Sequence, residues 1–394
     1  MTDGTGRILV VGAGIAGLAT AAALQRDGLP VTVVEERAEA SSGAGISIWP
    51  NALAALDEIG LGDAVRDAGG RVTAGAVRWR DGSWLRRPAP HRIVGALGEP
   101  LVVVQRSRLR DILAGALSPG TVRYRTAVAG LQLTADGVRV WFDADRSGRD
   151  RTVSAVIGAD GTRSVVARHL NGALPDRYAG YTAWRGVARF PLDPDLAGET
   201  LGPGCEVGHV PLGADRTYWF ATERVAEGAR APGGELAYLR TKLAGWADPI
   251  PALLAATPAP EVLRNDLYDR APARQWARGP VVVVGDAAHP MRPHLGQGGC
   301  QAIEDAAVLA WCLRRQADPA AAFARFAEHR RPRVDALVRE SRLIGRAMNL
   351  RPAWLGGLGS RATALIPEAA VTGHLASIAA GSAFRLPGDH PSAQ

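Results

Sequence analysis

Residues 7–25, RILVVGAGIAGLATAAALQ, decide the fold class of this 394-residue chain. Residues 8–11 form a short, fully apolar run, which is typical of a central strand in a parallel sheet. The segment GAGIAG, residues 12–17, follows without a break, and residues 15–25 are rich in Ala and Leu, which favours a helix. The pattern therefore predicts a buried strand, a tight glycine turn and a helix in direct succession.

The next segment completes a βαβ unit. The β-branched run at residues 31–34 predicts a second strand, and Glu35 stands at its end, followed by Glu36. Strand, GxGxxG, helix, strand and acid at about this spacing form the dinucleotide-binding fingerprint, in which the acid accepts hydrogen bonds from a ribose. The fingerprint favours a dinucleotide site over a plain glycine-rich turn, and it leaves NAD and FAD as alternatives.

Each glycine of the turn has its own physical role. Gly12 permits the tight turn, Gly14 lets the backbone approach a pyrophosphate, and Gly17 lets helix and strand pack closely. The helix N-terminus adds unpaired N–H groups and about half a positive charge, and both suit phosphate groups.

A second glycine-rich unit lies late in the chain. Residues 281–310 read VVVVGDAAHPMRPHLGQGGCQAIEDAAVLA. The first four predict another parallel strand, and Asp286 follows near its carboxyl end, where open α/β sheets bind ligands. Pro290 and Pro293 predict an extended loop. Residues 296–299, GQGG, then present backbone without bulky side chains, ahead of a helix whose positive N-terminus points back at the loop.

A third unit lies between these two. Residues 153–170 read VSAVIGADGTRSVVARHL. They predict a strand ending at Ala159, a turn at Asp160-Gly161 and a helix that opens near Ser164. By itself, an Asp-Gly pair after a strand indicates a turn in which Asp caps the following helix.

Together the three units resemble the class A, single-component FAD-dependent monooxygenases that share the p-hydroxybenzoate hydroxylase fold. In that family a GxGxxG unit, a DG motif and a GD motif all bind one FAD. Here they stand in the same order at residues 12–17, at Asp160-Gly161 and at Gly285-Asp286, and the likeness runs to about residue 350. The resemblance implies an α/β fold: a Rossmann-like FAD-binding domain of the glutathione-reductase type, a second, mostly antiparallel β-sheet substrate domain, and a short C-terminal helical region.

The resemblance also implies how the chain would hold FAD. The glycine turn would take the pyrophosphate, and Glu35 the ribose. Asp286 would bind the ribityl chain, and the loop at residues 296–299 would lie along the isoalloxazine. The expected cofactor contacts are Gly12, Gly14, Ala16, Gly17, Glu35, Glu36, Ser47, Arg106, Val128, Asp160, Asp286, Gly296, Gly298 and Gly299. Cys300 stands where Asn is frequent in the family, and we interpret it as a small buried packing residue.

The same resemblance divides the chain into regions. The expected FAD-binding domain comprises residues 1–70, 97–178 and 275–350, the substrate domain residues 71–96 and 179–274, and the C-terminal helical region residues 351–394. Within the substrate domain, AVRWRDGSW predicts a hairpin with an Asp-Gly turn. The stretches GVARF, EVGHVPL and TYWFATE predict strands, and ELAYLRTKLAGWA predicts an amphipathic helix.

The implied reaction is a monooxygenation. NAD(P)H would bind transiently and reduce FAD, and O2 would then give a flavin C4a-hydroperoxide that transfers one oxygen atom to an aromatic or polycyclic small molecule, as in natural-product biosynthesis. The site would have to exclude water to protect that species. The nearest-looking subgroup contains urate- and salicylate-hydroxylase-like enzymes and bacterial natural-product hydroxylases. Glu206 stands where urate hydroxylases place a substrate-side Arg, which argues against urate.

The substrate side rests on fewer residues. Ser47, Trp184, Arg185, His209, Tyr218 and Pro293 are expected to face the flavin, and the candidates for catalysis are Pro293, Arg185, His209 and Tyr218. His209 or Tyr218 could act as a base on a phenol, although we favour the simpler interpretation that both are sheet residues with satisfied hydrogen bonds. Arg185 could bind a substrate carboxylate or pair with an acid of the protein.

Composition excludes several other classes. The net charge is +7, but the basic residues are almost all Arg and are dispersed, which argues against a nucleic-acid binder. No apolar run reaches the ~18 residues of a membrane span, and the start of the chain lacks a signal-peptide pattern. Three scattered cysteines give neither a disulfide framework nor a metal site. We expect a cytoplasmic enzyme, monomeric or homodimeric, without metal.

Three rival interpretations remain at this stage. The first is a flavin-dependent reductase or dehydrogenase of the same fold that does not oxygenate. The second is a non-catalytic flavin-binding protein or partner-binding subunit. The third is an NAD-linked dehydrogenase that uses only the first fingerprint, which leaves Asp160 and Asp286 without a role and predicts a colourless protein.

Overall fold

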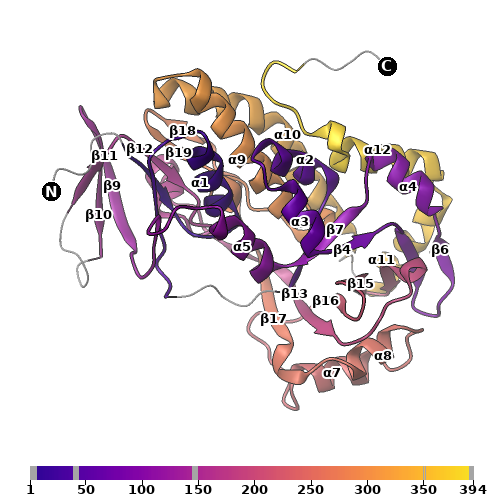
Figure 1. The fold of residues 1–394 in the computed structure, drawn as a ribbon. Helices are drawn as coiled ribbons and strands as arrows, with labels where there is room; N and C mark the ends of the chain where they lie inside the picture. Colours follow the sequence, from indigo (N-terminus) through magenta and orange to yellow (C-terminus); the bar gives the residue numbers. More distant parts are fainter. Residues whose placement is uncertain (1–6, 39–43, 144–149, 349, 351, 390–394) are drawn as a thin grey trace.

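A computed structural model describes residues 7–38, 44–143, 150–348, 350 and 352–389 (Figure 1). Its first large sheet has six strands in the order β18-β19-β12-β1-β2-β8. Neighbouring strands are parallel except for the edge strand β18, which pairs antiparallel with β19. The strands are β1 (Ile8–Val11), β2 (Val31–Val34), β8 (Val122–Arg123), β12 (Ala155–Gly158), β18 (Ala277–Arg278) and β19 (Val281–Val283).

The centre of this sheet is apolar on both faces, as a parallel sheet between helices requires. The strands β1, β2, β12 and β19 are buried at every position. Two helices, α1 (Ile15–Arg26) and α9 (Gly298–Arg315), pack together in the same core, and the long helix α10 (Pro319–Met348) packs on α9. The strands and helix predicted from the first fingerprint are therefore confirmed.

The order of the strands brings the three motifs together. β19, β12 and β1 are neighbours in the sheet and run in the same direction. Gly12, Asp160 and Asp286 all follow the carboxyl ends of these strands. The GxGxxG, DG and GD motifs are far apart in the sequence. In the sheet they nevertheless lie side by side at the carboxyl ends of adjacent strands, where open α/β folds bind ligands.

The second large sheet has seven strands in the order β17-β13-β16-β15-β14-β5-β6. All pairs are antiparallel except β14 with β5. The strands are β5 (Ala76–Trp79), β6 (Trp84–Arg86), β13 (Arg177–Ala188), β14 (Gly198–Gly202), β15 (Cys205–Pro211), β16 (Thr217–Glu223) and β17 (Leu263–Asp269). The predicted hairpin and the three predicted strands are confirmed.

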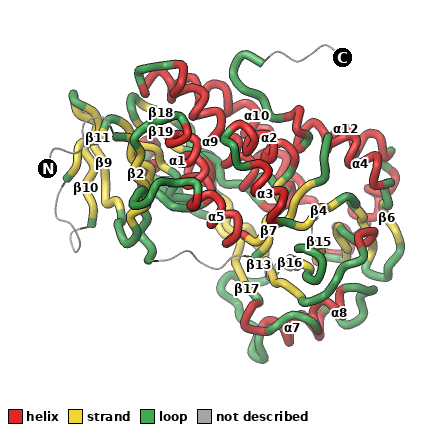
Figure 2. Tube along the Cα trace, viewed as in Figure 1, coloured by secondary structure: helices red, strands yellow, loops and turns green. Residues whose placement is uncertain are grey.

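The two faces of the second sheet meet different partners. One face packs its tryptophans against α7 (Glu235–Lys242) and α8 (Ile250–Ala255), which lie at the lower end of the molecule (Figures 1 and 2). The other face packs against a small sheet of β3 (Gly45–Ile48), β4 (Gly70–Val72) and β7 (Leu101–Gln105). That small sheet connects the second large sheet to the core around the six-stranded sheet.

The remaining elements complete the core and the surface. A three-stranded sheet consists of β9 (Val128–Thr134), β10 (Gly137–Phe142) and β11 (Arg151–Val153). The other α-helices are α2 (Pro50–Glu58), α3 (Gly62–Ala68), α4 (Pro90–Leu97), α5 (Arg106–Gly115), α6 (Val165–Asn171), α11 (Ala353–Ala362) and α12 (Glu368–Ala379). Among the described residues, no helix is both long and apolar enough to cross a membrane.

The loop before α9 differs from the expectation. Pro290 and Pro293 were expected to keep it extended, but Gly285–Ala287 and Pro293–Leu295 each form a 3-10 turn. Proline fixes φ near −65°, which also suits the first position of a helical turn, so Pro293 starts its turn directly after the extended Arg292. The division of the chain into domains stays a prediction.

Candidate active site

The first glycine turn is shaped by close backbone packing. Gly12 has a φ of +103°, and a Cβ there would lie 2.4 Å from the carbonyl oxygen of Ala159. A Cβ on Gly17 would lie 1.9 Å from the carbonyl oxygen of Gly12. Both positions therefore require glycine for the strand, turn and helix to pack, whether or not a ligand is bound.

Gly14 is different because the fold leaves space around it. A Cβ on Gly14 would meet no atom within 4 Å. Gly14 is also the N-cap of α1, where no side chain caps the helix and no acidic residue occupies its first turn. Open space beside an uncapped, positive helix end is the arrangement that accepts a pyrophosphate.

Glu35 is tied to this turn. Its Oε2 accepts a hydrogen bond from the Ala13 N–H at 2.9 Å, and its Oε1 accepts one from the Arg37 N–H at 3.0 Å. Glu36 is exposed, with its carboxylate 3.9 Å from the Arg37 guanidinium. Of the two acids, Glu35 is the one that the structure holds against the glycine turn.

Asp160 combines a structural bond with an unpaired oxygen. Its Oδ2 accepts a hydrogen bond from the Val165 N–H at 2.7 Å, and Ser164 caps the same helix, α6, through the Ala167 N–H at 2.8 Å. The helix-capping interpretation of this Asp-Gly pair is therefore correct. The Oδ1 of Asp160 is buried without a partner among the described residues. Burial raises the pKa of Asp160, against the hydrogen bonds that it accepts.

Asp286 lies at the neighbouring strand end with its side chain exposed. The turn before it depends on Gly285, which has a φ of +58° and whose Cβ would lie 2.8 Å from the Cβ of Ala16 and 3.3 Å from that of Ala302. Ala16 belongs to α1 and Ala302 to α9. The two glycine-rich units thus meet at Gly285, and Asp286 is held beside the N-terminal end of α1.

Arg270 is a site residue that the sequence analysis missed. It is buried, and its Nη2 donates hydrogen bonds to the carbonyl oxygens of Asp286 and Ala287, both at 2.8 Å. Its Nε and Nη1 have no partner among the described residues, and Asp160 and Asp176 are its acidic neighbours. A single arginine at the end of β17 carries no sequence signal, because only the fold brings it to the DG and GD motifs.

The loop at residues 296–299 borders β3. Gly296 has a φ of +62°, and a Cβ there would lie 2.9 Å from Nε1 of Trp49. A Cβ on Gly299 would lie 2.7 Å from Cδ1 of Ile46, whereas Gly298 has no such close contact. The loop therefore presents bare backbone at the uncapped N-terminus of α9.

Cys300 follows this loop in the first turn of α9. It is fully buried, and its thiol contacts the carbonyl oxygen of Ser47 in β3 at 3.5 Å. Burial raises the pKa of the Cys300 thiol to about 12, so it stays protonated. This agrees with a packing residue rather than a nucleophile.

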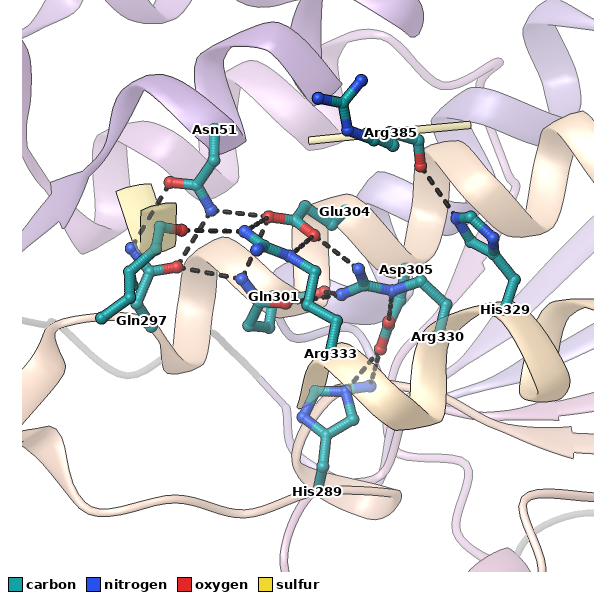
Figure 3. A network of polar contacts seen from close by, with 12 residues as sticks. Asn51, His289, Gln297, Gln301, Glu304, Asp305, His329, Arg330, Arg333 and Arg385 are labelled. Atoms are coloured by element: carbon teal, nitrogen blue, oxygen red, sulfur yellow. Dashed lines mark hydrogen bonds and ion pairs between the residues drawn. The ribbon is translucent and has the colours of Figure 1, made fainter. Parts of the chain in front are cut away.

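A buried ionic network fixes the turn at Gly285 (Figure 3). Asp305 accepts hydrogen bonds from the Gly285 N–H at 2.9 Å and from Arg330 Nε at 2.8 Å, and its Oδ2 lies 2.6 Å from His289 Nε2. Burial disfavours the charge of Asp305, but His289 and Arg330 lower its pKa to about 2. The GD turn is thereby fastened to α9 and α10.

The neighbouring Glu304 extends the network to α2. It accepts hydrogen bonds from Arg330 at 2.5 Å, from Arg333 at 3.0 Å and from the Asn51 amide at 2.6 Å. Asn51 also donates to Gln297, the N-cap of α9, at 2.9 Å (Figure 3). The segment QAIEDA thus supplies the acids that orient the flavin-side loop, a role that the sequence analysis did not assign.

Two further expected cofactor residues lie at the starts of α5 and β9. Arg106 begins α5, is exposed, and its backbone N–H bonds to the Ala44 carbonyl at 3.1 Å. Val128 begins β9 and is buried. Arg110, one helical turn after Arg106, reaches the Ala13 carbonyl at 3.4 Å and was not predicted.

The expected substrate side is the face of the second sheet that meets β3. A Cβ on Gly45 of β3 would lie 2.5 Å from Cγ of Tyr218, so the Tyr218 ring packs directly on that strand. Arg185 donates to Asn265 Oδ1 at 3.1 Å and, with Arg106, lies beside the Tyr218 hydroxyl. Burial raises the pKa of Tyr218, although both arginines act in the opposite direction. The structure thus brings Arg106, Arg185 and Tyr218 together.

His209 and Trp184 do not face this side, so that part of the expectation was wrong. Side chains alternate along a strand, and both point to the face that α7 and α8 cover. Trp184 donates to Glu235 of α7 at 2.7 Å, and His209 is fully buried with Nε2 3.2 Å from the Thr200 hydroxyl. Burial, with Arg78 nearby, lowers the pKa of His209 to about 4.

Pro293 is exposed at the start of the loop, and the neighbouring His294 was not predicted. His294 Nε2 lies 2.9 Å from the Tyr181 hydroxyl, and its Nδ1 lies 3.7 Å from Glu206 Oε1. The loop that carries the expected flavin contacts therefore also reaches the second sheet. Among the described residues, no cluster of His, Cys, Asp and Glu could hold a metal ion.

The family model of the FAD binding domain matches residues 6–187 and 265–341. The chain belongs to this family. Aurachin C monooxygenase/isomerase from Stigmatella aurantiaca is 39% identical over 342 residues, covering 86% of this chain and 88% of the relative. FAD-dependent urate hydroxylase from Klebsiella pneumoniae is 33% identical over 362 residues, covering 88% and 93%.

A solved structure of an FAD-bound protein has a similar fold. The crystal structure of Klebsiella pneumoniae HpxO complexed with FAD and uric acid matches with a TM-score of 0.87 at 29% identity, over 94% of this chain and 96% of that one. The α/β fold, FAD as the cofactor and the assignment as an FAD-dependent monooxygenase are confirmed. NAD(P)H is the usual reductant of the family.

The residues present fit FAD by their own chemistry. The space at Gly14, the exposed carboxylate of Asp286 and the bare loop at residues 296–299 are arranged along one sheet edge. Buried atoms of Asp160 and Arg270 that have no partner within the described ranges lie at the same ends of these strands. An extended dinucleotide offers phosphate, hydroxyl and ring groups in the order that such an edge can bind.

Proposed function

We propose that the chain hydroxylates an aromatic or polycyclic small molecule with NAD(P)H and O2 as co-substrates. Bound FAD supplies the redox chemistry: it takes two electrons from NAD(P)H and activates O2, of which one atom enters the substrate and the other leaves as water. The observation that carries the proposal is the convergence of Gly12, Asp160 and Asp286 on the ends of three adjacent parallel strands.

On this proposal the chain's own residues bind and orient. Gly12, Gly14, Ala16 and Gly17 admit the pyrophosphate to the end of α1, and Glu35, aided by Glu36, binds the ribose. Asp286 and Arg106 bind the ribityl side, with Ser47, Val128 and Asp160 as further contacts. Gly296, Gly298 and Gly299 place the positive end of α9 beside the ring, where it stabilises negative charge.

Arg185 and Tyr218 orient the reacting ring of the substrate. The raised pKa of Tyr218 keeps its hydroxyl protonated, so it serves as a hydrogen-bond donor rather than as a base. Arg185 holds a positive charge at the same place, which attracts a phenolate or carboxylate oxygen. Pro293 closes the flavin-side loop over the ring, and His209 has no part in the reaction.

Localisation, oligomeric state and the exclusion of urate are part of the same proposal. We propose a cytoplasmic monomer or homodimer, and three free, buried cysteines support a reducing compartment. Urate is disfavoured as the substrate because Glu206 contributes an acid to the substrate side. A reductase without oxygenation is the alternative that the experiment below separates.

The test is an absorption spectrum followed by turnover. The purified protein should show two flavin bands and release FAD on heating. A panel of phenols should then accelerate NAD(P)H oxidation, and 18O2 should place one labelled atom in the product. Asp286→Ala should weaken FAD retention at least tenfold, whereas the exposed surface acid variant Asp215→Asn should not. A coloured protein that oxidises NAD(P)H without labelling any product would point to the reductase.

A further inference from the structure

Two glutamates lie on the substrate-facing side of the second sheet. In the antiparallel pair β14–β15, Glu199 lies opposite Gly208 and Leu201 lies opposite Glu206. Glu199 and Glu206 are therefore diagonal neighbours on one face, close enough to interact. Glu206 also lies opposite Thr222 of β16, four residues along that strand from Tyr218.

Glu206 is buried and only half satisfied. Its side chain is 8% exposed, and its Oε1 accepts a hydrogen bond from the Thr222 hydroxyl at 2.9 Å. No hydrogen bond within the described residues reaches its Oε2. This oxygen is not among the fully enclosed atoms, so it is accessible to a ligand or water.

Glu199 borders the same space. Its side chain is half-buried, and burial raises its pKa. No hydrogen bond to its carboxylate occurs within the described residues. The pair thus forms one acidic wall beside the loop that carries His294.

Among the described residues, no arginine or lysine pairs with Glu206. Buried Glu304 and Asp305 have Arg330 between them, whereas Glu206 has the His294 ring at 3.7 Å. Burial lowers the pKa of His294 to about 4, so that ring is neutral. Burial and the neighbouring Glu199 raise the pKa of Glu206 to about 8. A hydrogen-bond donor with partial or full positive charge is the group that would satisfy both acids.

We propose that Glu206, with Glu199 beside it, binds a nitrogen–hydrogen group of the substrate and so selects nitrogen-bearing aromatic molecules. This inference rests on the proposed hydroxylase function and names its substrate class. The oxygen end of the molecule lies at Arg185 and Tyr218, and the N–H end lies at Glu206. Tyr218 and Thr222 are four steps apart along the strand, on the order of 13 Å at strand spacing, which suits a fused-ring molecule.

The wall also explains which molecules the site rejects. A urate or carboxylate anion placed with its charge at Glu206 would meet two carboxyl groups and a neutral imidazole but no cation among the described residues. Anionic substrates would have to keep their charge at the Arg185 end. The site therefore distinguishes the two ends of a molecule by opposite charge.

The experiment compares probes that differ only at the nitrogen. The holoenzyme is titrated with 3-aminophenol against 3-methylphenol and with 5-hydroxyindole against 2-naphthol. Dissociation constants come from the flavin difference spectrum and are checked by the shift in unfolding temperature. The variants are Glu206→Leu, Glu206→Gln, which keeps an acceptor oxygen, and the control Glu223→Gln. Glu223 lies on the opposite face of the sheet, where it pairs with Lys242 at 2.6 Å.

The expected result, above pH 8 where Glu206 is ionised, is at least ~10-fold tighter binding of the N–H member of each pair, since a hydrogen bond to a charged group contributes about that much. Glu206→Leu should reduce the ratio below ~3, Glu206→Gln should retain part of it, and Glu223→Gln all of it. Equal binding within both pairs, failure of the N–H members to bind, or a ratio that survives Glu206→Leu would overturn the inference. Binding with the expected ratio but without oxygenated product would instead count against the proposed function.

Discussion

At the scale of single residues, the glycines of the first fingerprint separate into two kinds. Gly12 and Gly17 are required by packing, because a Cβ would lie within 2.4 Å of backbone oxygens. Gly14 borders open space, so only a ligand would require it to be glycine. The sequence pattern predicted a different role for each glycine; the packing roles of Gly12 and Gly17 are confirmed, and the pyrophosphate role of Gly14 stays a prediction.

This difference makes Gly14→Val a selective test of cofactor binding. Its backbone φ of −77° suits valine, so the apoprotein should unfold within ~2 °C of the wild type. Retention of FAD should fall more than tenfold, because the side chain fills the place of the pyrophosphate. The matched variant Gly17→Val should instead lower the unfolding temperature strongly. Normal FAD retention by Gly14→Val would show that the phosphates lie elsewhere.

Glu206 predicts a pH dependence of stability at the same scale. In the folded protein the pKa of the Glu206 carboxyl is raised to about 8, above the ordinary 4.5 of an unfolded glutamate. The group's contribution is thus fully present below pH 4.5 and is lost as pH rises toward 8. Glu199, His294 and Tyr181 face residue 206 in the wild type, and they are unchanged in the variant Glu206→Gln.

Glu206→Gln removes this contribution. Relative to the wild type without ligand, the variant should gain on the order of 1 kcal/mol or more in free energy of unfolding between pH 5 and pH 8. Denaturant unfolding at four pH values measures the gap. A gap that stays constant over this range would mean that Glu206 is not held protonated.

At the scale of secondary-structure elements, local pattern predicted most of the strands and the helices that carry motifs. The apolar runs became β1, β2 and β19, and the glycine loops led into α1 and α9. The local pattern could not predict the buried ion pairs that join these elements. Arg330 and Asp305 are 25 residues apart, and nothing local to either one indicates the pairing. Only the antiparallel packing of α10 on α9 creates it.

That network predicts a sharp stability effect. Arg330→Met leaves Glu304 and Asp305 buried without their shared cation, and loss of one partner of a buried ion pair costs about 3–5 kcal/mol. Denaturant unfolding measures the loss. The variant should also release FAD faster, because the Gly285 turn loses its anchor. The exposed neighbour variant Arg331→Met provides the control, and similar stability of both variants would contradict a structural role for the network.

At the scale of the whole molecule, the second sheet decides which residues meet the substrate. The sequence predicted its strands, yet it placed His209 and Trp184 on the wrong face, because a strand that is buried on both sides shows no alternation of polarity. The placement of Tyr218 and Arg185 on the flavin side came only from the family resemblance and stays a prediction. The opposite faces are distinguished by their contacts with β3 on one side and with α7 and α8 on the other.

This arrangement predicts opposite outcomes for two substitutions in neighbouring strands. Tyr218→Phe removes the hydroxyl beside Arg185 and should lower kcat/KM by roughly 10-fold or more, the range expected for one lost hydrogen bond to a developing charge, while FAD retention stays normal. His209→Leu lies on the face covered by α7 and α8 and should leave kcat/KM within about twofold. Steady-state NAD(P)H oxidation coupled to product formation measures both. The reverse pattern would mean that the flavin lies on the α7 side, and the placement of Arg185, Glu199 and Glu206 in the substrate site would be lost with it.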